Sequence, residues 1–147
     1  MPELTPALVV EAIEPTHGRR TLTTFLGRSI SIAGDSRVEH GGQGTGPDGF
    51  DLVSAALGQC LLTTLLAKAQ ADGVQLTGAR VVVSTKSRLR GSRGAPYLSD
   101  FDAEIVLEGD IDEATRVVLA EHAERFCGVR ETLLRMPRID ARVRVER

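Results

Sequence analysis

The stretch GPDGFDLVSAALGQC, residues 46–60, decides the fold that we expect for this chain. Turn-forming residues lead into a run of small and apolar side chains that ends before Asp72 and Gly73, a pair typical of a helix end. Apolar residues fall on nearly every face of this run, and a helix that is apolar all round is a buried one. We therefore predict a buried helix over residues 51–71, with Cys60 near its middle.

The segments around this helix predict a mixed fold. Residues rich in β-branched side chains indicate strands at 7–14, 21–32, 79–84, 97–108 and 139–145. The segment 21–32 is either one bulged strand or two short strands around Gly27. The resulting order of β-rich segment, long helix, two strands, helix and strand indicates a single α+β domain over residues 1–147.

A second helix is expected from about residue 111 to 126. Asp110, with Glu113 three residues later, opens this helix in a capping-box pattern, with Asp in place of Ser or Thr. A short helical turn should follow as far as Arg135. The glycine-rich segment 33–49 is long for a passive connection, and loops of such length are often functional.

The composition excludes several classes of function. Of the 147 residues, 41% are hydrophobic and 26% charged, which suits a globular domain with its own core. Aromatic residues make up only 3%, so the chain lacks the stacking surfaces that single-stranded nucleic acid requires. The net charge of -2 argues against a phosphate-backbone binder. We therefore expect no nucleic-acid partner.

The sequence also indicates a cytoplasmic protein without a membrane partner. No basic start precedes an N-terminal apolar run, and the longest uncharged run, Leu52–Ala67, is short for a bilayer span. A permanent disulfide is not expected in that compartment. The three histidines stand at no ligand-like spacing from the two cysteines, so no metal and no cofactor are predicted.

The two cysteines, Cys60 and Cys127, have two interpretations. Both can be small core residues, because free Cys is among the most buried residue types. Alternatively they form a dithiol in which one thiolate attacks an oxidant and the other resolves the product as a disulfide. That chemistry requires a lowered thiol pKa. Because Cys60 lies well inside its helix, the N-terminus of that helix cannot lower its pKa, and a cation, preferably Arg, has to approach.

Three segments of the chain resemble the OsmC/Ohr family. GPDGFDLVSAALGQC is similar to the family's Pro-containing loop, acidic residue and Ala-rich turn before a Cys on the central helix. FCGVRETL, residues 126–133, resembles the segment of the second Cys, although Gly128 stands where the family commonly has Pro. SRVEHGGQGTGP, residues 36–47, resembles the family's Arg-containing loop. The resemblance runs from about residue 7 to 145.

The resemblance implies an OsmC-like fold, with β-sheets around two long helices, in an intertwined homodimer. It further implies a thiol-dependent peroxidase of oxidative stress defence, which reduces organic hydroperoxides and is itself reduced by an external dithiol. By position, Cys60 matches the peroxidatic thiolate and Cys127 the resolving thiol. Arg37 best matches the Arg that supports the thiolate, and Arg19 is the alternative. Asp51 matches the carboxylate that orients the Arg.

Asp51 departs from the family pattern in length and in phase. It is one carbon shorter than the usual Glu, and nine residues of ideal helix separate it from Cys60, about 13.5 Å along the axis and on the opposite side. It can therefore act only through a bridging Arg or from a non-helical position.

The alternative function is a non-catalytic, dimeric OsmC-like module that binds a small apolar ligand, in which both cysteines are incidental.

Overall fold

The computed structural model describes residues 7–92, 94–135 and 137–146, and the chain divides into two compact units, Met1–Val53 and Ser54–Arg147. Helices and antiparallel strands are both present, as predicted for an α+β chain. The single domain inferred from the sequence stays a prediction. Each unit is described by itself below.

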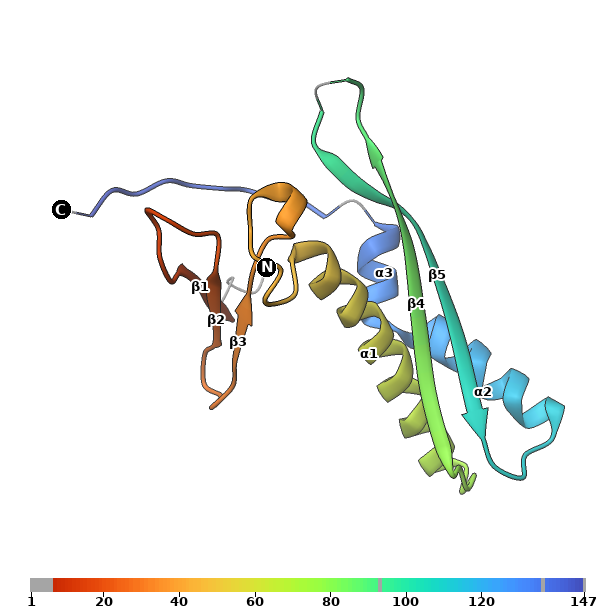
Figure 1. Ribbon diagram of the computed structural model, residues 1–147. Coiled ribbons are helices and arrows are strands. Elements are labelled where there is room, and N and C mark those ends of the chain that lie inside the picture. The colour runs from red at the N-terminus through yellow and green to blue at the C-terminus, as the bar shows by residue number, and fades with distance from the viewer. Residues whose placement is uncertain (1–6, 93, 136, 147) are drawn as a thin grey trace. The chain divides into compact units, whose positions relative to one another are not determined.

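The first unit is built on a three-stranded antiparallel sheet (Figure 1). Its strands lie side by side in chain order and are β1 (Leu8–Ala12), β2 (Thr21–Phe25) and β3 (Ser31–Gly34). Of the two possibilities for residues 21–32, the structure therefore has two short strands. The chain turns between them at Gly27, whose φ of 74° lies in the left-handed region that glycine tolerates best.

The second unit has a long β-hairpin with helices packed against one face (Figure 1). The hairpin consists of β4 (Gly78–Leu89) and β5 (Pro96–Glu108), paired in antiparallel register with Val81 opposite Ile105. Alternate residues of both strands face the core, as the period of a strand requires. The helices are α1 (Gly49–Ala71), which begins in the first unit, α2 (Glu113–Phe126) and α3 (Gly128–Leu134).

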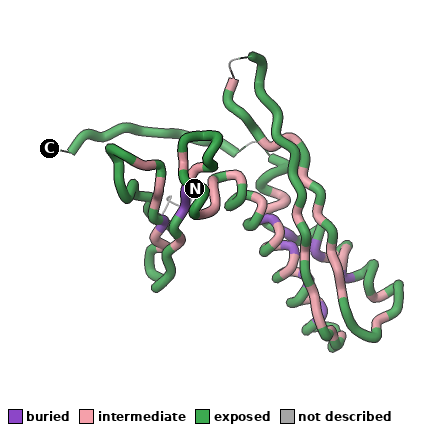
Figure 2. Tube along the Cα trace, viewed as in Figure 1, coloured by how far each residue is buried: buried purple, intermediate pink, exposed green. Residues whose placement is uncertain are grey.

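The core of the second unit lies between α1, α2 and the hairpin, where Figure 2 shows the buried residues. Its fully covered members are Leu57, Leu61, Leu65, Ala69, Leu119, Ala123 and Cys127. The four residues from α1 recur every fourth position and so form one stripe. By length and composition α1 is also apolar enough to cross a membrane. The stripe places one side of α1 in the core of this unit.

The prediction that α1 is buried all round is wrong for the described chain. Leu52, Val53 and Leu66 are exposed, because the hairpin and α2 cover only one side of the helix. The predicted end of the helix is correct: α1 stops at Ala71, before Gly73 with its φ of 69°. Its start lies two residues earlier than predicted.

Two further predictions are corrected by the structure. The cap of α2 is Asp112 rather than Asp110, because the Asp112 carboxylate accepts a hydrogen bond of 2.8 Å from the Thr115 N–H. The strand predicted at 139–145 is not formed in the described residues 137–146. Its alternating pattern is present, but a strand requires a neighbouring edge to pair with its backbone groups.

Candidate functional site

The structure brings the two cysteines together in the second unit. Cys60 lies on α1 and is half-buried, whereas Cys127 is fully buried at the junction of α2 and α3. Cys127 belongs to the buried core cluster of this unit and Cys60 packs against that cluster, and each thiol contributes to the pKa shift of the other. Within the described residues no disulfide joins the two cysteines. A second cysteine in contact with the first is the arrangement that a dithiol mechanism requires.

Cys127 is held firmly by the two helices that meet at it. Its N–H donates to the Ala123 carbonyl at 3.1 Å, and its own carbonyl accepts from the Glu131 N–H at 3.1 Å. Its sulfur accepts from the Arg130 N–H at 3.3 Å and so caps α3. These contacts fix the position from which the Cys127 thiol meets Cys60.

Hydrogen bonds lower the pKa of Cys60. Burial raises this pKa, but hydrogen-bonding groups around Cys60 together outweigh burial. In decreasing order of effect they are the Val129 N–H, the Cys127 thiol, the Gly128 N–H and the Thr64 hydroxyl, the last of which donates to the Cys60 carbonyl at 2.7 Å. A cation was expected on the basis of the Cys60 helix alone, whereas the main-chain groups that lower this pKa come from the start of α3.

The pKa of Cys127 is shifted in the opposite direction. Burial raises it first, and the neighbouring Cys60 raises it further, although the N–H groups of Arg130 and Val129 act against this. Of the two thiols, Cys60 therefore ionises first and Cys127 stays protonated. A nucleophilic thiol requires a lowered pKa of this kind.

We predict that Gly128→Pro raises the pKa of Cys60. Proline has no N–H to donate, yet it is favoured at the first position of a helix, so α3 should remain intact. Since a hydrogen bond to a charged group contributes about 1.5–3 kcal/mol, the thiolate fraction at neutral pH should fall about tenfold or more. The pH dependence of iodoacetamide alkylation, measured in the Cys127→Ser background, reports this single thiol.

Gly128→Ala is the matched control for this prediction. It keeps the N–H, and a Cβ added at Gly128 meets no atom within 4 Å. Its alkylation curve should coincide with that of the Cys127→Ser parent, while the curve of the Pro variant moves to higher pH. Equal displacement of both curves would show that the Gly128 amide does not stabilise the thiolate.

In the first unit, Arg37 forms an ion-paired cluster with two carboxylates. Its Nε donates to Asp48 Oδ2 at 2.7 Å and its Nη2 to Asp51 Oδ1 at 3.1 Å. Arg37 directly precedes the short 3-10 helix η1 (Val38–His40). The pKa of Arg37 is raised, most strongly by the hydrogen bond to the Asp48 side chain and next by the negative charges of both carboxylates. The guanidinium is therefore permanently charged and held in one orientation.

The two carboxylates also cap α1. The Asp51 N–H donates to Asp48 Oδ1 at 2.9 Å, and the Asp48 N–H donates to Asp51 Oδ2 at 3.0 Å. This is a reciprocal capping box, in which each carboxylate bonds the helix start with one oxygen and Arg37 with the other. The Asp51 N–H also lowers the pKa of Asp48 more than any other contact. Asp51 is thus a capping residue that contacts the Arg, as a bridging role requires.

Arg19, the alternative to Arg37, has a different environment. Its guanidinium lies against Gly41, where an added Cβ would come within 2.9 Å of Nε. Among the described residues it forms no ion pair, whereas Arg37 forms two. The predicted site residues thus form two pairs, Cys60 with Cys127 and Arg37 with Asp51, one in each unit. The action of an Arg on Cys60 stays a prediction.

Three contributors to these clusters were not predicted from the sequence. Asp48 forms the shorter bond to Arg37, and its signal was present as Asp-x-x-Asp before an apolar run. The amides of Gly128 and Val129 left no such signal, because they act through the main chain and depend on tertiary packing.

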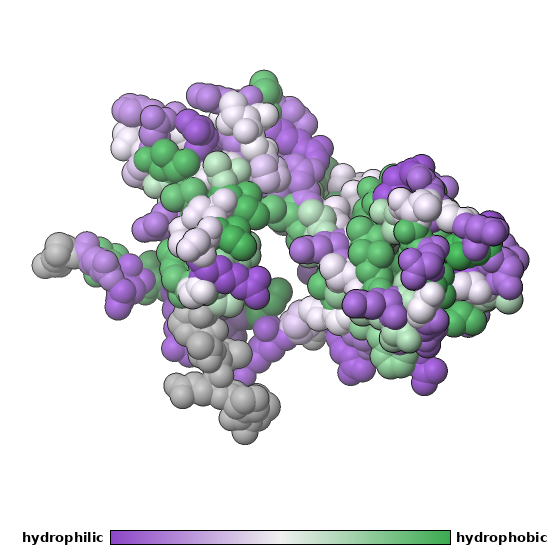
Figure 3. Space-filling view, turned by 90° about the horizontal axis from the view of Figure 1, so that it is seen from below, coloured by the Kyte–Doolittle hydropathy of each residue, from purple (hydrophilic) through white to green (hydrophobic). Residues whose placement is uncertain are grey.

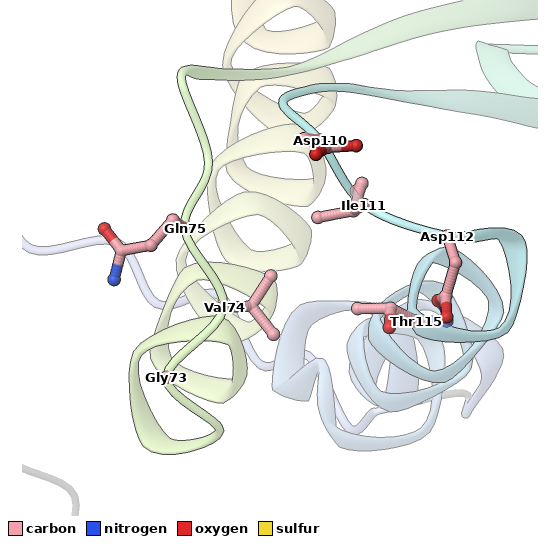
Figure 4. A pocket seen from close by; sticks show the side chains of 7 residues that line it. All are labelled: Gly73, Val74, Gln75, Asp110, Ile111, Asp112 and Thr115. Carbon is pink, nitrogen blue, oxygen red and sulfur yellow. The ribbon is translucent and has the colours of Figure 1, made fainter.

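A surface pocket of about 510 Å³ lies at the end of α1, near the start of α2 (Figure 4). Its lining comprises Gly73, Val74, Gln75, Asp110, Ile111, Asp112 and Thr115. Asp112 and Thr115 are already used in the cap of α2. None of the predicted site residues lines this pocket, so it is separate from the cysteine pair. Within the described residues, no group of three His, Cys, Asp or Glu side chains is arranged to hold a metal.

Solved structures share the fold of this chain at low sequence identity. A Psychrobacter arcticus 273-4 protein linked by name to osmotic stress and detoxification has a TM-score of 0.76 and 20% identity, with 88% of this chain and 89% of that one covered. An organic hydroperoxide resistance protein OsmC from Legionella pneumophila has a TM-score of 0.67 and 14% identity, with 89% of this chain and 91% of that one covered. An OsmC-like hydroperoxide resistance protein from Jannaschia sp. CCS1 has a TM-score of 0.57 and 20% identity, with 86% of this chain and 83% of that one covered.

These similarities establish the fold, and the sequence establishes the family. No curated protein matches the chain. The profile of the OsmC-like protein family, however, matches residues 42–142, which include the capping box, both cysteines and every element from α1 to α3. The OsmC-like fold and the resemblance inferred from the sequence are thereby confirmed. The chain belongs to the OsmC-like protein family.

Proposed function

We propose that this protein is a thiol-dependent peroxidase that reduces organic hydroperoxides in oxidative stress defence. The observation that carries the proposal is the packing of Cys60 against the cluster that contains Cys127, together with pKa shifts of the two thiols in opposite directions. The names of the similar Legionella and Jannaschia proteins, which refer to hydroperoxide resistance, agree with this chemistry. Inert core cysteines would need neither the donors to Cys60 nor the difference between the two thiols.

The first step oxidises Cys60. Its thiolate attacks the distal oxygen of ROOH, the S–O bond forms as the O–O bond breaks, and RO⁻ leaves and is protonated to ROH. Cys60 is then an uncharged sulfenic acid. Because the negative charge of Cys60 contributes to the raised pKa of Cys127, its loss favours ionisation of Cys127. The resolving thiol is thus activated only after the peroxide has reacted.

The second step joins the two sulfurs. The Cys127 thiolate attacks the Cys60 sulfur, a disulfide forms, and the hydroxyl group leaves as water after taking up a proton. An external dithiol then reduces the disulfide by thiol–disulfide exchange and restores both thiols. The cycle uses no metal and no cofactor.

In this proposal Arg37 polarises the peroxide and supports the developing charge. It is favoured over Arg19 because Asp48 and Asp51 fix the direction of its guanidinium. Preorganised charge of this kind is usually a large part of transition-state stabilisation. Asp51 would act through Arg37, consistent with its place in the capping box.

We also propose a cytoplasmic homodimer with its sites at the subunit interface. The described chain leaves many large apolar side chains exposed, and Figure 3 shows them spread over the visible surface. They include Val9, Val10, Leu66, Ile139, Val143 and Val145. A second copy that covers such surface would also provide an apolar entrance, which favours alkyl, aryl and lipid hydroperoxides over hydrogen peroxide.

Stopped-flow mixing of the reduced protein with cumene hydroperoxide tests the proposed function. We expect rapid loss of both thiols and one intramolecular disulfide per chain, identified by mass spectrometry, with a slower reaction for hydrogen peroxide. Absence of rapid oxidation would overturn the proposal and leave the non-catalytic, ligand-binding module as the function to pursue.

A further inference from the structure

Asp35 is a buried carboxylate directly after β3, in the same unit as Arg37. It is only 4% exposed, although an isolated charge is costly to bury. Its Oδ2 accepts three hydrogen bonds, from the Gln43 N–H at 3.0 Å, the Thr45 N–H at 3.1 Å and the Thr45 hydroxyl at 2.9 Å. These donors, with the Thr45 N–H first, lower the pKa of Asp35 and keep it ionised.

The loop between Asp35 and α1 closes tightly around this carboxylate. The Gly42 N–H donates to the Arg37 carbonyl at 3.0 Å, and the Gly44 N–H donates to the Ser36 carbonyl at 3.1 Å. A Cβ at Gly42 would lie 1.9 Å from the Ser36 oxygen and 2.8 Å from Asp35 Oδ1. Only glycine fits there, so the loop packs closely against Ser36 and the Asp35 carboxylate.

Arg37 and Asp48 stand on the two arms of this loop. Arg37 follows Asp35 by two residues, while Asp48 follows Pro47, whose carbonyl accepts from the Asp35 N–H at 3.2 Å. The 2.7 Å bond from Arg37 to Asp48 therefore spans the arms that Asp35 draws together. The three bonds to Oδ2 tie the intervening residues to the same point.

We propose that Asp35 is a positioning residue that sets the geometry of the Arg37 guanidinium. Arg37 is half exposed and has a long, flexible side chain, so its orientation depends on where its main chain and its two carboxylate partners are held. The Asp48 and Asp51 side chains are in turn fixed by the start of α1. Asp35 fixes the remaining main-chain segment, which carries Arg37. The effect on peroxide chemistry rests on the proposed function, whereas the effect on the Arg37 geometry does not.

Asp35→Asn tests this inference with almost no change in size. An amide has one acceptor oxygen without a full charge, so the three bonds to Oδ2 weaken and the loop loosens. The ¹⁵N NMR signal of the Arg37 Nε–H, identified by its absence in Arg37→Met, should shift and exchange faster with solvent. The rate of reaction with cumene hydroperoxide should fall about tenfold to a hundredfold, as expected for a misplaced catalytic group.

A double-mutant cycle separates positioning from a general loss of structure. In the Arg37→Met background, Asp35→Asn should cause no further loss of peroxide reactivity, because the group that it positions is already absent. A further loss of the same size would contradict the inference. Thr45→Val removes only the hydroxyl donor and should give an intermediate NMR shift, which keeps the test decisive even if Asp35→Asn fails to fold.

Glu39→Gln is the matched control. Glu39 is an exposed carboxylate on η1, in the same loop, and its loss should alter neither the Nε–H signal nor the rate. If the wild type does not react with peroxide but Asp35→Asn still shifts the Arg37 signal, the proposed function fails and the positioning role stands. An unchanged Arg37 signal in both Asp35→Asn and Thr45→Val would overturn the inference.

Discussion

A Cys60→Ser variant is expected to lose its reaction with cumene hydroperoxide by at least about a thousandfold, the scale on which removal of a nucleophile acts. The hydroxyl of serine remains protonated at neutral pH, so the donors that stabilise the Cys60 thiolate have no anion to stabilise. Stopped-flow measurement with an excess of peroxide gives the second-order rate constant. The remaining thiol, Cys127, should react slowly because its pKa is raised.

Cys127→Ser is the matched variant for the same experiment. It removes the resolving sulfur but keeps a hydroxyl that can donate to Cys60. The first step should therefore proceed, and the protein should stop after one turnover as a sulfenic acid that dimedone traps. If Cys127→Ser loses the first step and Cys60→Ser retains it, the two roles are reversed.

The sequence predicted those parts of the fold that local patterns determine. The end of α1 follows from Gly73, and the strands β4 and β5 follow from alternation that the buried face confirms. The hairpin proved longer than predicted, because the charged residues up to Leu89 continue the strand pairing beyond the core. Charged residues occur both in exposed strands and in loops, so they do not show which of the two this segment forms.

The failures involve contacts that a local pattern does not contain. Asp110 and Asp112 offer the same side chain two residues apart, and only the path of the chain decides that Asp112 meets the Thr115 N–H. Residues 139–145 have the alternation of a strand, but no described strand pairs with them. The exposed side of α1 similarly reflects what packs against the helix rather than its composition.

The candidate site also has features that the sequence predicts and features that depend on tertiary packing. The cysteine pair and the contact between Arg37 and Asp51 agree with positions taken from the family resemblance, and the second contact follows locally from a capping box. The stabilisation of Cys60 could not be read from the sequence. It comes from amides that every residue except proline possesses, and only the packing of α3 against α1 aims them at the sulfur.

Arg37→Met should lower the rate of reaction with cumene hydroperoxide about 100- to 1000-fold, as removal of a preorganised charge-stabilising donor does elsewhere. Methionine fills much of the same space but cannot bond Asp48 or Asp51. The capping box joins these two carboxylates without Arg37, so α1 should keep its start and the variant should fold. The same stopped-flow assay measures the effect, with Arg28→Met as a control at an exposed turn position.

Three further comparisons test how Arg37 acts. Iodoacetamide does not need its oxygen polarised, so an unchanged alkylation curve in Arg37→Met would place the Arg on the peroxide, and a curve moved to higher pH would place it on the thiolate. Arg19→Met should react like the wild type, because Arg19 lacks the carboxylate partners that hold Arg37. A large loss in Arg19→Met with none in Arg37→Met would transfer the role to Arg19.

Asp51→Asn should lower the rate of reaction with cumene hydroperoxide less than Arg37→Met does, because the shorter bond to Asp48 still holds the guanidinium.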